Sequence, residues 1–343
     1  MTPVHNSRVL FNKIPTGYPI PGETTVYDDT PTIDLDNVAL NGGVLLKTIA
    51  LSIDPHMRGK MRDASIKSYS AAYEVAKPLS NYGVAKVLRS ESHKFQPGDF
   101  VVGLIDFEKY TVRNDVDALL LINNKFNLPL HSFLGACGSR GQTAYYAWRE
   151  FVKPNPGDTA FVSTGAGAVG AVFVQLAKEA GYKVIASAGS EKKVEFLKSI
   201  GTDVAFNYKT EKTADVLQKH GPVHMCVLYF DNVGGETLEA ALSNMADFGL
   251  IIACGMASGY NSAPYHNLMS IVAKRLTIRG FIASDFHGKY RDEFFQEIPP
   301  KYAQGHLKIM EENIIGLENA EEAIVSVQKG TNWGKVVVIV ADA

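Results

Sequence analysis

Three glycines with the spacing Gly165-x-Gly167-x-x-Gly170 lie between two apolar runs, 159–163 and 171–177, which are typical of a β-strand and a helix respectively. In such a unit the glycines permit a tight turn, close approach of a pyrophosphate, and close packing of helix on strand. The helix N-terminus adds N–H groups and a positive dipole end that favour an anion. The alternative is a glycine-rich turn in an ordinary β-α-β unit. The flanking strand and helix favour a dinucleotide-binding loop.

The second predicted strand, 183–187, indicates which dinucleotide is bound. Domains built for NAD usually carry Asp or Glu at the tip of this strand, about 20 residues after the glycines. Here the strand runs into Gly189-Ser190 without an acid; Ser190 is typical of an N-cap, and Glu191 of the first turn of the next helix. Lys192 and Lys193 follow, where a cation can meet a 2′-phosphate, although a lysine pair can also be a solvated helix face. The missing acid and the two cations together favour NADPH over NADH.

Composition limits the class of protein. The chain has 343 residues, 46% hydrophobic and 20% charged, with a net charge of −2, so nothing in its balance favours binding to nucleic acid or anionic membrane. No apolar run approaches the roughly 20 residues of a membrane helix, and the first residues do not resemble a targeting signal. We therefore expect a cytoplasmic protein. Its three cysteines are too scattered for a disulfide framework or a four-thiolate zinc site, and no Cys/His cluster predicts a catalytic metal.

Strands and helices alternate after residue 159, which predicts a doubly wound parallel sheet. The expected strands are 159–163, 183–187, 203–206, 223–230, 249–253 and 276–281. Short strands and turns from about residue 9 to 121 indicate a β-rich domain, and a helix is expected at 134–148. Two amphipathic helices, 290–305 and 319–329, precede a last strand, 335–340, which we expect to return to the N-terminal domain. The predicted fold class is α/β, with a β-rich domain formed by 1–128 and 310–343 and a Rossmann cofactor domain formed by 129–309.

The chain resembles the zinc-independent medium-chain dehydrogenase/reductases, in the branch of alkenal double-bond reductases and leukotriene B4 12-hydroxydehydrogenase–prostaglandin reductases. The resemblance runs nearly end to end, and its motifs occur in the family's order and spacing. They are Asp54-Pro55-His56-Met57-Arg58-Gly59, Tyr82-Gly83-Val84, Ala188-Gly189-Ser190, Phe206-Asn207-Tyr208-Lys209, Asp231-Asn232-Val233-Gly234-Gly235, Cys254-Gly255, Ser258-Gly259-Tyr260-Asn261, Gly280-Phe281 and Asn332-Trp333-Gly334-Lys335. One departure is His56, which stands where the family's DPYMRG segment has tyrosine.

The resemblance implies a GroES-like β-rich catalytic domain, a Rossmann domain that binds NADPH, and a homodimer. Lys193 would pair with the 2′-phosphate and Tyr208 would lie against the adenosine end. The remaining cofactor residues implied are Gly165, Gly167, Ala168, Val169 and Gly170 at the pyrophosphate, Gly189 and Ser190 at the tip of the second strand, and Asn232, Cys254, Gly255, Phe281 and Asn332 for the nicotinamide half. Asn232 could equally be a turn residue, and Cys254 lacks the neighbouring base that a catalytic thiol needs.

The implied reaction is reduction of a carbon–carbon double bond conjugated to a carbonyl, with hydride delivered to the β-carbon and negative charge building on the carbonyl oxygen. Tyr260 is the implied donor to that enolate, and the ribose hydroxyl of the cofactor could do the same work. His56, Tyr82 and Tyr260 would line the substrate pocket. Two other readings stay open: a quinone reductase of the same superfamily, and an NADPH-binding regulatory protein without turnover.

Overall fold

The computed structural model describes residues 3–66, 68, 70–221, 226–258 and 276–342. The chain divides into two compact units, one formed by Met1–Leu134 with Glu311–Ala343 and the other by Gly135–Met310. We call them the β-rich unit and the Rossmann unit and describe each by itself. The β-rich unit is made of both ends of the chain, and the Rossmann unit is inserted between them in sequence.

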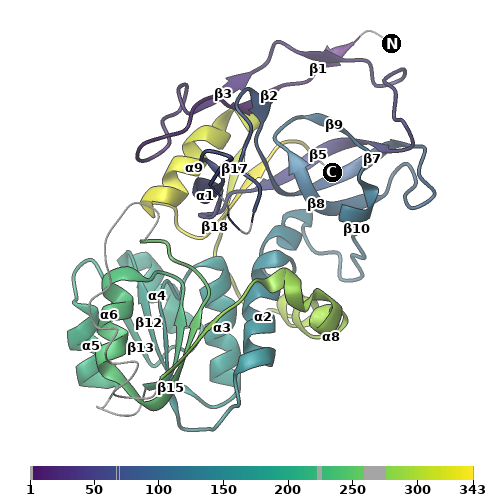
Figure 1. The fold of residues 1–343 in the computed structure, drawn as a ribbon. Coiled ribbons are helices and arrows are strands. Elements are labelled where there is room, and N and C mark those ends of the chain that lie inside the picture. The colour runs from purple at the N-terminus through teal and green to yellow at the C-terminus, as the bar shows by residue number, and fades with distance from the viewer. Residues whose placement is uncertain (1–2, 67, 69, 222–225, 259–275, 343) are drawn as a thin grey trace. The chain divides into compact units, whose positions relative to one another are not determined.

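Six parallel strands form the sheet of the Rossmann unit, in the order β13-β12-β11-β14-β15-β16 (Figure 1). The first strand in sequence, β11, lies in the middle. The next two strands are added on one side of it and the last three on the other, as in dinucleotide-binding folds. The strands are β11 (Thr159–Val162), β12 (Lys183–Ala188), β13 (Val204–Asn207), β14 (Cys226–Asp231), β15 (Met245–Ala253) and β16 (Thr277–Gly280). The predicted doubly wound parallel sheet is confirmed.

Helices pack on both faces of this sheet (Figure 1). On one face, α5 and α6 bury apolar side chains against Phe161 and Tyr229, whose rings stack at 4.8 Å. On the other face, Phe173 of α3 stacks on Phe230 of β14 at 3.9 Å, and α2 packs on α3. The helices are α2 (Ser139–Phe151), α3 (Ala168–Glu179), α4 (Glu191–Ser199), α5 (Thr213–His220), α6 (Gly235–Asn244) and α8 (His287–Ala303), with a 3-10 turn at Ala283–Phe286.

A mostly antiparallel sheet organises the β-rich unit, in the order β10-β8-β7-β5-β18-β17, with β9 also paired to β5. Two smaller sheets, β3-β2-β6 and β1-β4, complete it. The strands are β1 (Val4–His5), β2 (Arg8–Phe11), β3 (Thr25–Asp28), β4 (Thr32–Ile33), β5 (Val44–Ser52), β6 (Lys77–Pro78), β7 (Ser80–Ser90), β8 (Phe100–Asp106), β9 (Tyr110–Arg113), β10 (Leu120–Leu121), β17 (Glu311–Ile315) and β18 (Lys335–Ile339). The helices are α1 (Met57–Lys60) and α9 (Ala320–Lys329), with 3-10 turns at Val116–Ala118, Leu130–Leu134 and Leu317–Asn319.

The last strand, β18, lies between β5 and β17, antiparallel to the first and parallel to the second. It therefore joins the N-terminal strands, as expected from the sequence. Glu321 of α9 ties this C-terminal part to β3, because its carboxylate accepts hydrogen bonds from the N–H groups of Gly22 and Tyr27 and from Thr25 Oγ1, at 2.8–3.0 Å.

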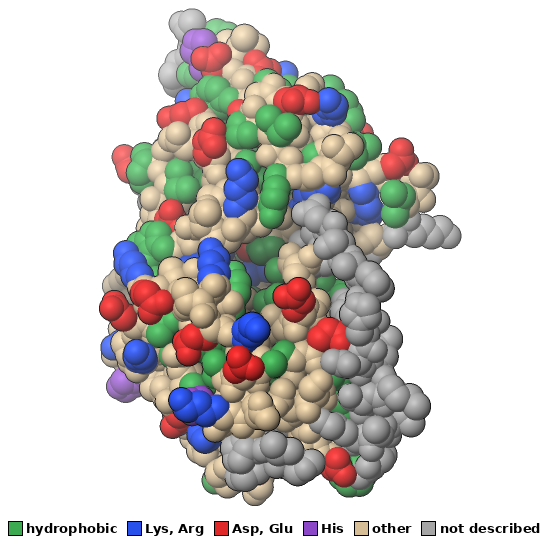
Figure 2. Space-filling model, turned by 90° about the vertical axis from the view of Figure 1, so that its left-hand side faces the viewer, with side chains coloured by type: hydrophobic (Ala, Val, Ile, Leu, Met, Phe, Trp, Pro, Cys, Tyr) green, Lys and Arg blue, Asp and Glu red, His purple; other side chains and the backbone are tan. Residues whose placement is uncertain are grey.

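Several predicted boundaries differ from the structure. The helix expected at 134–148 is a 3-10 turn that ends at Leu134, followed by α2, which begins only at Ser139. The α8 helix begins earlier than expected and contains Pro299 and Pro300 in its C-terminal half. No helix in the described part of the chain is long and apolar enough to span a bilayer. Acidic and basic side chains are interspersed on the face drawn in Figure 2.

Candidate active site

The glycine loop connects β11 to α3, which has Gly167 as its N-cap. A Cβ at Gly165 would lie 2.8 Å from the Cβ of Ala186 in β12, and a Cβ at Gly170 would lie 2.5 Å from the carbonyl oxygen of Thr164. Both distances are shorter than real Cβ contacts, so only glycine fits at either position. The first turn of α3 therefore packs directly on the loop backbone. This close packing is the cradle that a pyrophosphate requires.

The N–H groups at the start of α3 are suited to an anion. The first backbone bond of the helix runs from Ala171 N to Gly167 O, at 2.9 Å, so the N–H groups of Ala168, Val169 and Gly170 come before it. Such groups have no partner within their own helix and lie at its positive end. Gly165, Gly167, Ala168, Val169 and Gly170 therefore lie together after the carboxyl end of β11.

At the tip of β12, the first acid after the strand is Glu191, and a neighbouring strand engages it. Ser190 is the N-cap of α4, as predicted, but its side chain makes no capping hydrogen bond. Glu191 begins the helix, and its Oε1 accepts a hydrogen bond from Asn207 Nδ2 at 2.8 Å. The Glu191 carboxylate is thus engaged by a residue of β13.

Lys192 and Lys193 occupy the first turn of α4. Cations are unfavourable there because the N-terminal end of a helix carries the positive end of its dipole. Lys198, in the last turn of the same helix, has the favourable placement. A bound phosphate would offset the cost of the two lysines in the first turn.

Tyr208 packs on the tip of β12. Its N–H donates to Ala188 O at 3.0 Å, and a Cβ at Gly189 would lie 3.1–3.4 Å from the phenol ring. The side chain is nevertheless 46% exposed, and desolvation raises the pKa of its hydroxyl. A flat, half-exposed ring beside a glycine can take a purine face.

Asp231, at the end of β14, organises the next loop. Its Oδ1 accepts hydrogen bonds from Tyr229 Oη at 2.6 Å and from the N–H groups of Val233 and Gly234 at 2.9 and 2.8 Å. Its backbone oxygen accepts from the N–H groups of Cys254 and Gly255 at 2.8 and 3.0 Å. Burial raises the pKa of Asp231, although these donors act in the opposite direction. One buried acid therefore joins the ends of β14 and β15.

Asn232 is anchored to the neighbouring strand end. Its N–H donates to Ser163 Oγ at 2.9 Å and its Nδ2 donates to Ser163 O at 2.8 Å. These two bonds anchor the turn that follows β14, and the Oδ1 atom of Asn232 takes no part in them. Burial raises the pKa of the Cys254 thiol to about 12, against the nearby Arg140. A thiol in that state is not a nucleophile at neutral pH.

Two predicted residues of this unit remain, Phe281 and Tyr260. Phe281 follows β16, and its ring packs edge-on against Phe151, the last residue of α2, at 5.7 Å. Tyr260, the predicted enolate donor, lies outside the described residues. The carboxyl ends of β11, β12, β13, β14 and β15 lie at one edge of the sheet, because all these strands are parallel.

The β-rich unit carries the other three predicted residues. His56 is the N-cap of α1 and is partly buried. Tyr82 lies in β7, opposite Leu104 of β8 and with its side chain on the face away from the buried Asn81 and Gly83. Asn332 precedes β18, and its Nδ2 donates to Gly334 O at 2.7 Å.

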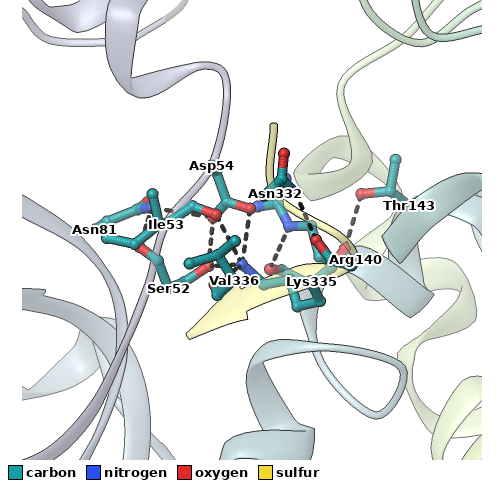
Figure 3. A network of polar contacts seen from close by, with 11 residues as sticks. Ser52, Ile53, Asp54, Asn81, Arg140, Thr143, Asn332, Lys335 and Val336 are labelled. Carbon is teal, nitrogen blue, oxygen red and sulfur yellow. Dashed lines mark hydrogen bonds and ion pairs between the residues drawn. The ribbon is translucent and has the colours of Figure 1, made fainter. Parts of the chain in front are cut away.

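A buried charged network lies next to these three residues in sequence (Figure 3). The Lys335 ammonium and the Asp54 carboxylate are 3.1 Å apart, with 2% and 3% of their side chains exposed. Asp54 also accepts hydrogen bonds from Ser52 Oγ and from Asn81 Nδ2. Asp54 and Lys335 belong to the sequence motifs, whereas Ser52 and Asn81 do not. Nothing in the spacing of the motifs predicted that Asp54 and Lys335 form an ion pair.

Sequence reasoning also missed three polar residues of the Rossmann unit: Ser163, Asn207 and Tyr229. Each makes side-chain hydrogen bonds near the carboxyl edge of the sheet: Asn207 to Glu191, Tyr229 to Asp231, and Ser163 to Asn232. A signal existed for Ser163, because it is a polar residue that closes an apolar strand. Buried polar groups of this kind need hydrogen-bond partners.

Two family models match the chain: "N-terminal domain of oxidoreductase" over residues 8–120 and "Zinc-binding dehydrogenase" over residues 168–299. The second description names zinc. Within the described part of the chain, however, no three His, Cys, Asp or Glu side chains are grouped as a metal site requires. The residues present therefore do not fit a zinc ion there.

Similar proteins cover the chain end to end. The NADP-dependent oxidoreductase RED1 of Cochliobolus heterostrophus is 39% identical, over 98% of both chains. The NADP(+)-dependent 2-alkenal reductase of Nicotiana tabacum is 38% identical, over 98% of both chains. The crystal structure of CurA from Vibrio vulnificus in complex with NADPH has a TM-score of 0.88 and 30% identity, and covers 98% of this chain and 100% of that one.

The glycine cradle, the parallel sheet and these full-length similarities agree with the resemblance carried by the motifs. The chain belongs to the zinc-independent medium-chain dehydrogenase/reductases, in the family of the alkenal double-bond reductases.

Proposed function

We propose that this protein is an NADPH-dependent reductase of the carbon–carbon double bond of α,β-unsaturated aldehydes and ketones. The full-length similarity to a 2-alkenal reductase supports the reaction. The observation that carries the cofactor is the tip of β12, where Asn207 holds the acid Glu191 and two lysines begin the next helix. Such a tip offers positive charge to a 2′-phosphate and no carboxylate to a ribose diol.

NADPH supplies a hydride to the β-carbon of the substrate when it is bound. The chain's own residues bind and orient the reactants: Gly165, Gly167, Ala168, Val169 and Gly170 for the pyrophosphate, Gly189, Ser190, Lys193 and Tyr208 for the adenosine end, and Asn232, Cys254, Gly255, Phe281 and Asn332 for the nicotinamide half. His56 and Tyr82 are proposed to contact the substrate. Tyr260 is proposed to donate a hydrogen bond to the enolate oxygen, a kind of contact worth about 10²–10³ in rate elsewhere.

The test is a substrate panel followed by the loss of reduced-nicotinamide absorbance. It contains a medium-chain 2-alkenal, an aryl enone and a quinone, each with NADPH and with NADH, and the products are identified. Saturated carbonyl products with a preference for NADPH support the proposal. An allylic alcohol would contradict it, activity on the quinone alone would identify a quinone reductase, and cofactor binding without any turnover would indicate a regulatory protein.

The cofactor preference has its own test in α4. Lys193→Ala removes the proposed partner of the 2′-phosphate, and Lys198→Ala removes a lysine from the opposite end of the same helix. We expect Lys193→Ala to raise the KM for NADPH at least about tenfold, since a hydrogen bond to a charged group contributes about 1.5–3 kcal/mol, and to leave the KM for NADH unchanged. Lys198→Ala should change neither value. Equal effects of the two variants would contradict the assignment.

We also propose that the protein is a homodimer. The strand β16 is the edge of the six-stranded sheet, paired with β15 on one side, and all four of its residues are exposed. Exposed edge strands can pair with a second chain, and a two-fold dimer would join two such edges. Light scattering at several concentrations measures the mass directly. Ile278→Lys, which adds a charge to the edge, should shift a dimer towards monomer.

A further inference from the structure

The network around Lys335 joins three segments that are far apart in sequence. Lys335 Nζ donates to Ser52 Oγ at 2.7 Å and to Ile53 O at 3.0 Å, at the end of β5. It also reaches Asp54 Oδ1 at 3.1 Å and its neighbour Val336 O at 2.9 Å. The ammonium therefore contacts these four oxygen atoms (Figure 3), and only 2% of its side chain is exposed.

Asp54 passes these contacts on to β7. Its Oδ2 accepts from Ser52 Oγ and from Asn81 Nδ2, and the same Asn81 amide donates to Ser52 O at 2.9 Å. Asn81 is fully buried. In Figure 3 the Asp54 carboxylate lies between the Asn81 amide and the Lys335 ammonium.

Asp54, Asn81 and Lys335 each lie within three residues, in sequence, of a residue with a proposed role in the reaction. His56 is two residues after Asp54, and α1 begins from that acid because Met57 N donates to Asp54 O at 3.1 Å. Tyr82 directly follows Asn81 in β7. Asn332 is three residues before Lys335, and its amide is bonded to Gly334 O.

We infer that the Lys335–Asp54 pair is a positioning device, which fixes the backbone that carries His56, Tyr82 and Asn332. The inference rests on the proposed reductase function. A buried ion pair is weak evidence for stability, because desolvation of the two charges offsets their attraction. In some proteins a buried polar or ionic group instead specifies one geometry. Here the geometry that it specifies is that of the three site residues.

The best variant neutralises both partners and keeps their volume: Lys335→Met combined with Asp54→Asn. Removing Lys335 alone would leave a buried carboxylate without its partner and could prevent folding. Ser52→Ala is the milder second variant, because it deletes only the hydroxyl that contacts both charges. The matched control is Glu321→Gln, which alters another buried carboxylate of the β-rich unit that anchors the segment 22–27.

The readouts are kcat on a 2-alkenal, the primary isotope effect with NADPH deuterated at the transferred position, the melting temperature, and amide hydrogen exchange. We expect kcat of the double variant to fall about 10- to 100-fold, since misplacement by about 1 Å can cost 10²-fold. The isotope effect should rise because hydride transfer becomes more rate-limiting. Exchange should increase at 55–60 and 332–334. Ser52→Ala should show the same changes to a smaller extent.

Glu321→Gln separates positioning from stability, because it should lower the melting temperature without altering the isotope effect or exchange at 55–60 and 332–334. If the two network variants keep the wild-type kcat and isotope effect while melting earlier, the pair is structural and the inference is overturned. A wild-type protein that reduces no enone would refute the proposed function instead. In that case, unchanged exchange at 55–60 and 332–334 in the double variant would overturn the inference as well.

Discussion

Replacing Gly170 with alanine places a methyl group where the structure leaves no room for one. The new Cβ would lie 2.5 Å from Thr164 O and 2.9 Å from the Cα of Gly165, and ordinary contact begins at 3.4 Å. Both neighbours are backbone atoms, so no side chain can move aside. To restore the first contact, the start of α3 must shift by about 0.9 Å from the loop. A shift of that size moves the N–H groups of the cradle away from a bound pyrophosphate.

We expect the Kd for NADPH of Gly170→Ala to rise about 10- to 100-fold, which corresponds to about 1.4–2.7 kcal/mol. Fluorescence titration of the reduced nicotinamide measures it. Gly167→Ala should have a smaller effect, because its Cβ would lie 3.1 Å from the same oxygen, a contact that a small adjustment relieves. Gly288→Ala in α8 is the control, because a Cβ there meets nothing within 4 Å. A Gly170→Ala protein that binds NADPH as tightly as this control would refute the reasoning.

Three further predictions follow from buried groups. Glu321→Ala leaves three donors in the segment 22–27 without their acceptor, so urea unfolding should show a loss of about 3 kcal/mol or more. Burial, with the neighbouring Asp106, raises the pKa of Glu108 to about 7; its contribution to stability is therefore full below the ordinary pKa of glutamate and is lost as the pH rises through 7. Glu108→Gln should unfold like the wild type at about pH 4 and later than the wild type at pH 8, by at most about 3 kcal/mol. The Cys254 thiol, with its raised pKa, should react with iodoacetamide much more slowly in the folded protein than in urea, as mass spectrometry of the peptide would show.

Local patterns predicted the Rossmann sheet well, because most of its strands are short apolar runs that alternate with helices along the chain. The glycine loop was also predictable, since its function depends on residue type at fixed spacing. Boundaries were less certain. A 3-10 turn ends at Leu134 and α2 begins at Ser139. Only the two glycines among residues 135–138 indicate this interruption in the sequence.

Contacts between distant segments could not be predicted from one sequence. Asn207 and Glu191 are 16 residues apart, and Lys335 and Asp54 are 281 apart. Nothing in local composition links such pairs, because they meet only when the sheets have formed. For the same reason the sequence allows Asn232 to be either a cofactor residue or a turn residue. Its hydrogen bond to Ser163, 69 residues earlier, is a tertiary contact that local sequence does not reveal.

The place of β18 in its sheet sets an order of events during synthesis. Ser52 and its partner Lys335 are 283 residues apart, and the whole Rossmann unit lies between them in sequence. At about 5–20 residues per second, β5 leaves the ribosome roughly 15–60 s before β18. During this interval Asp54 has no ammonium to neutralise it, and β5 lacks one neighbour. The nascent N-terminal segment is therefore exposed to aggregation and chaperones for as long as the inserted unit takes to be made.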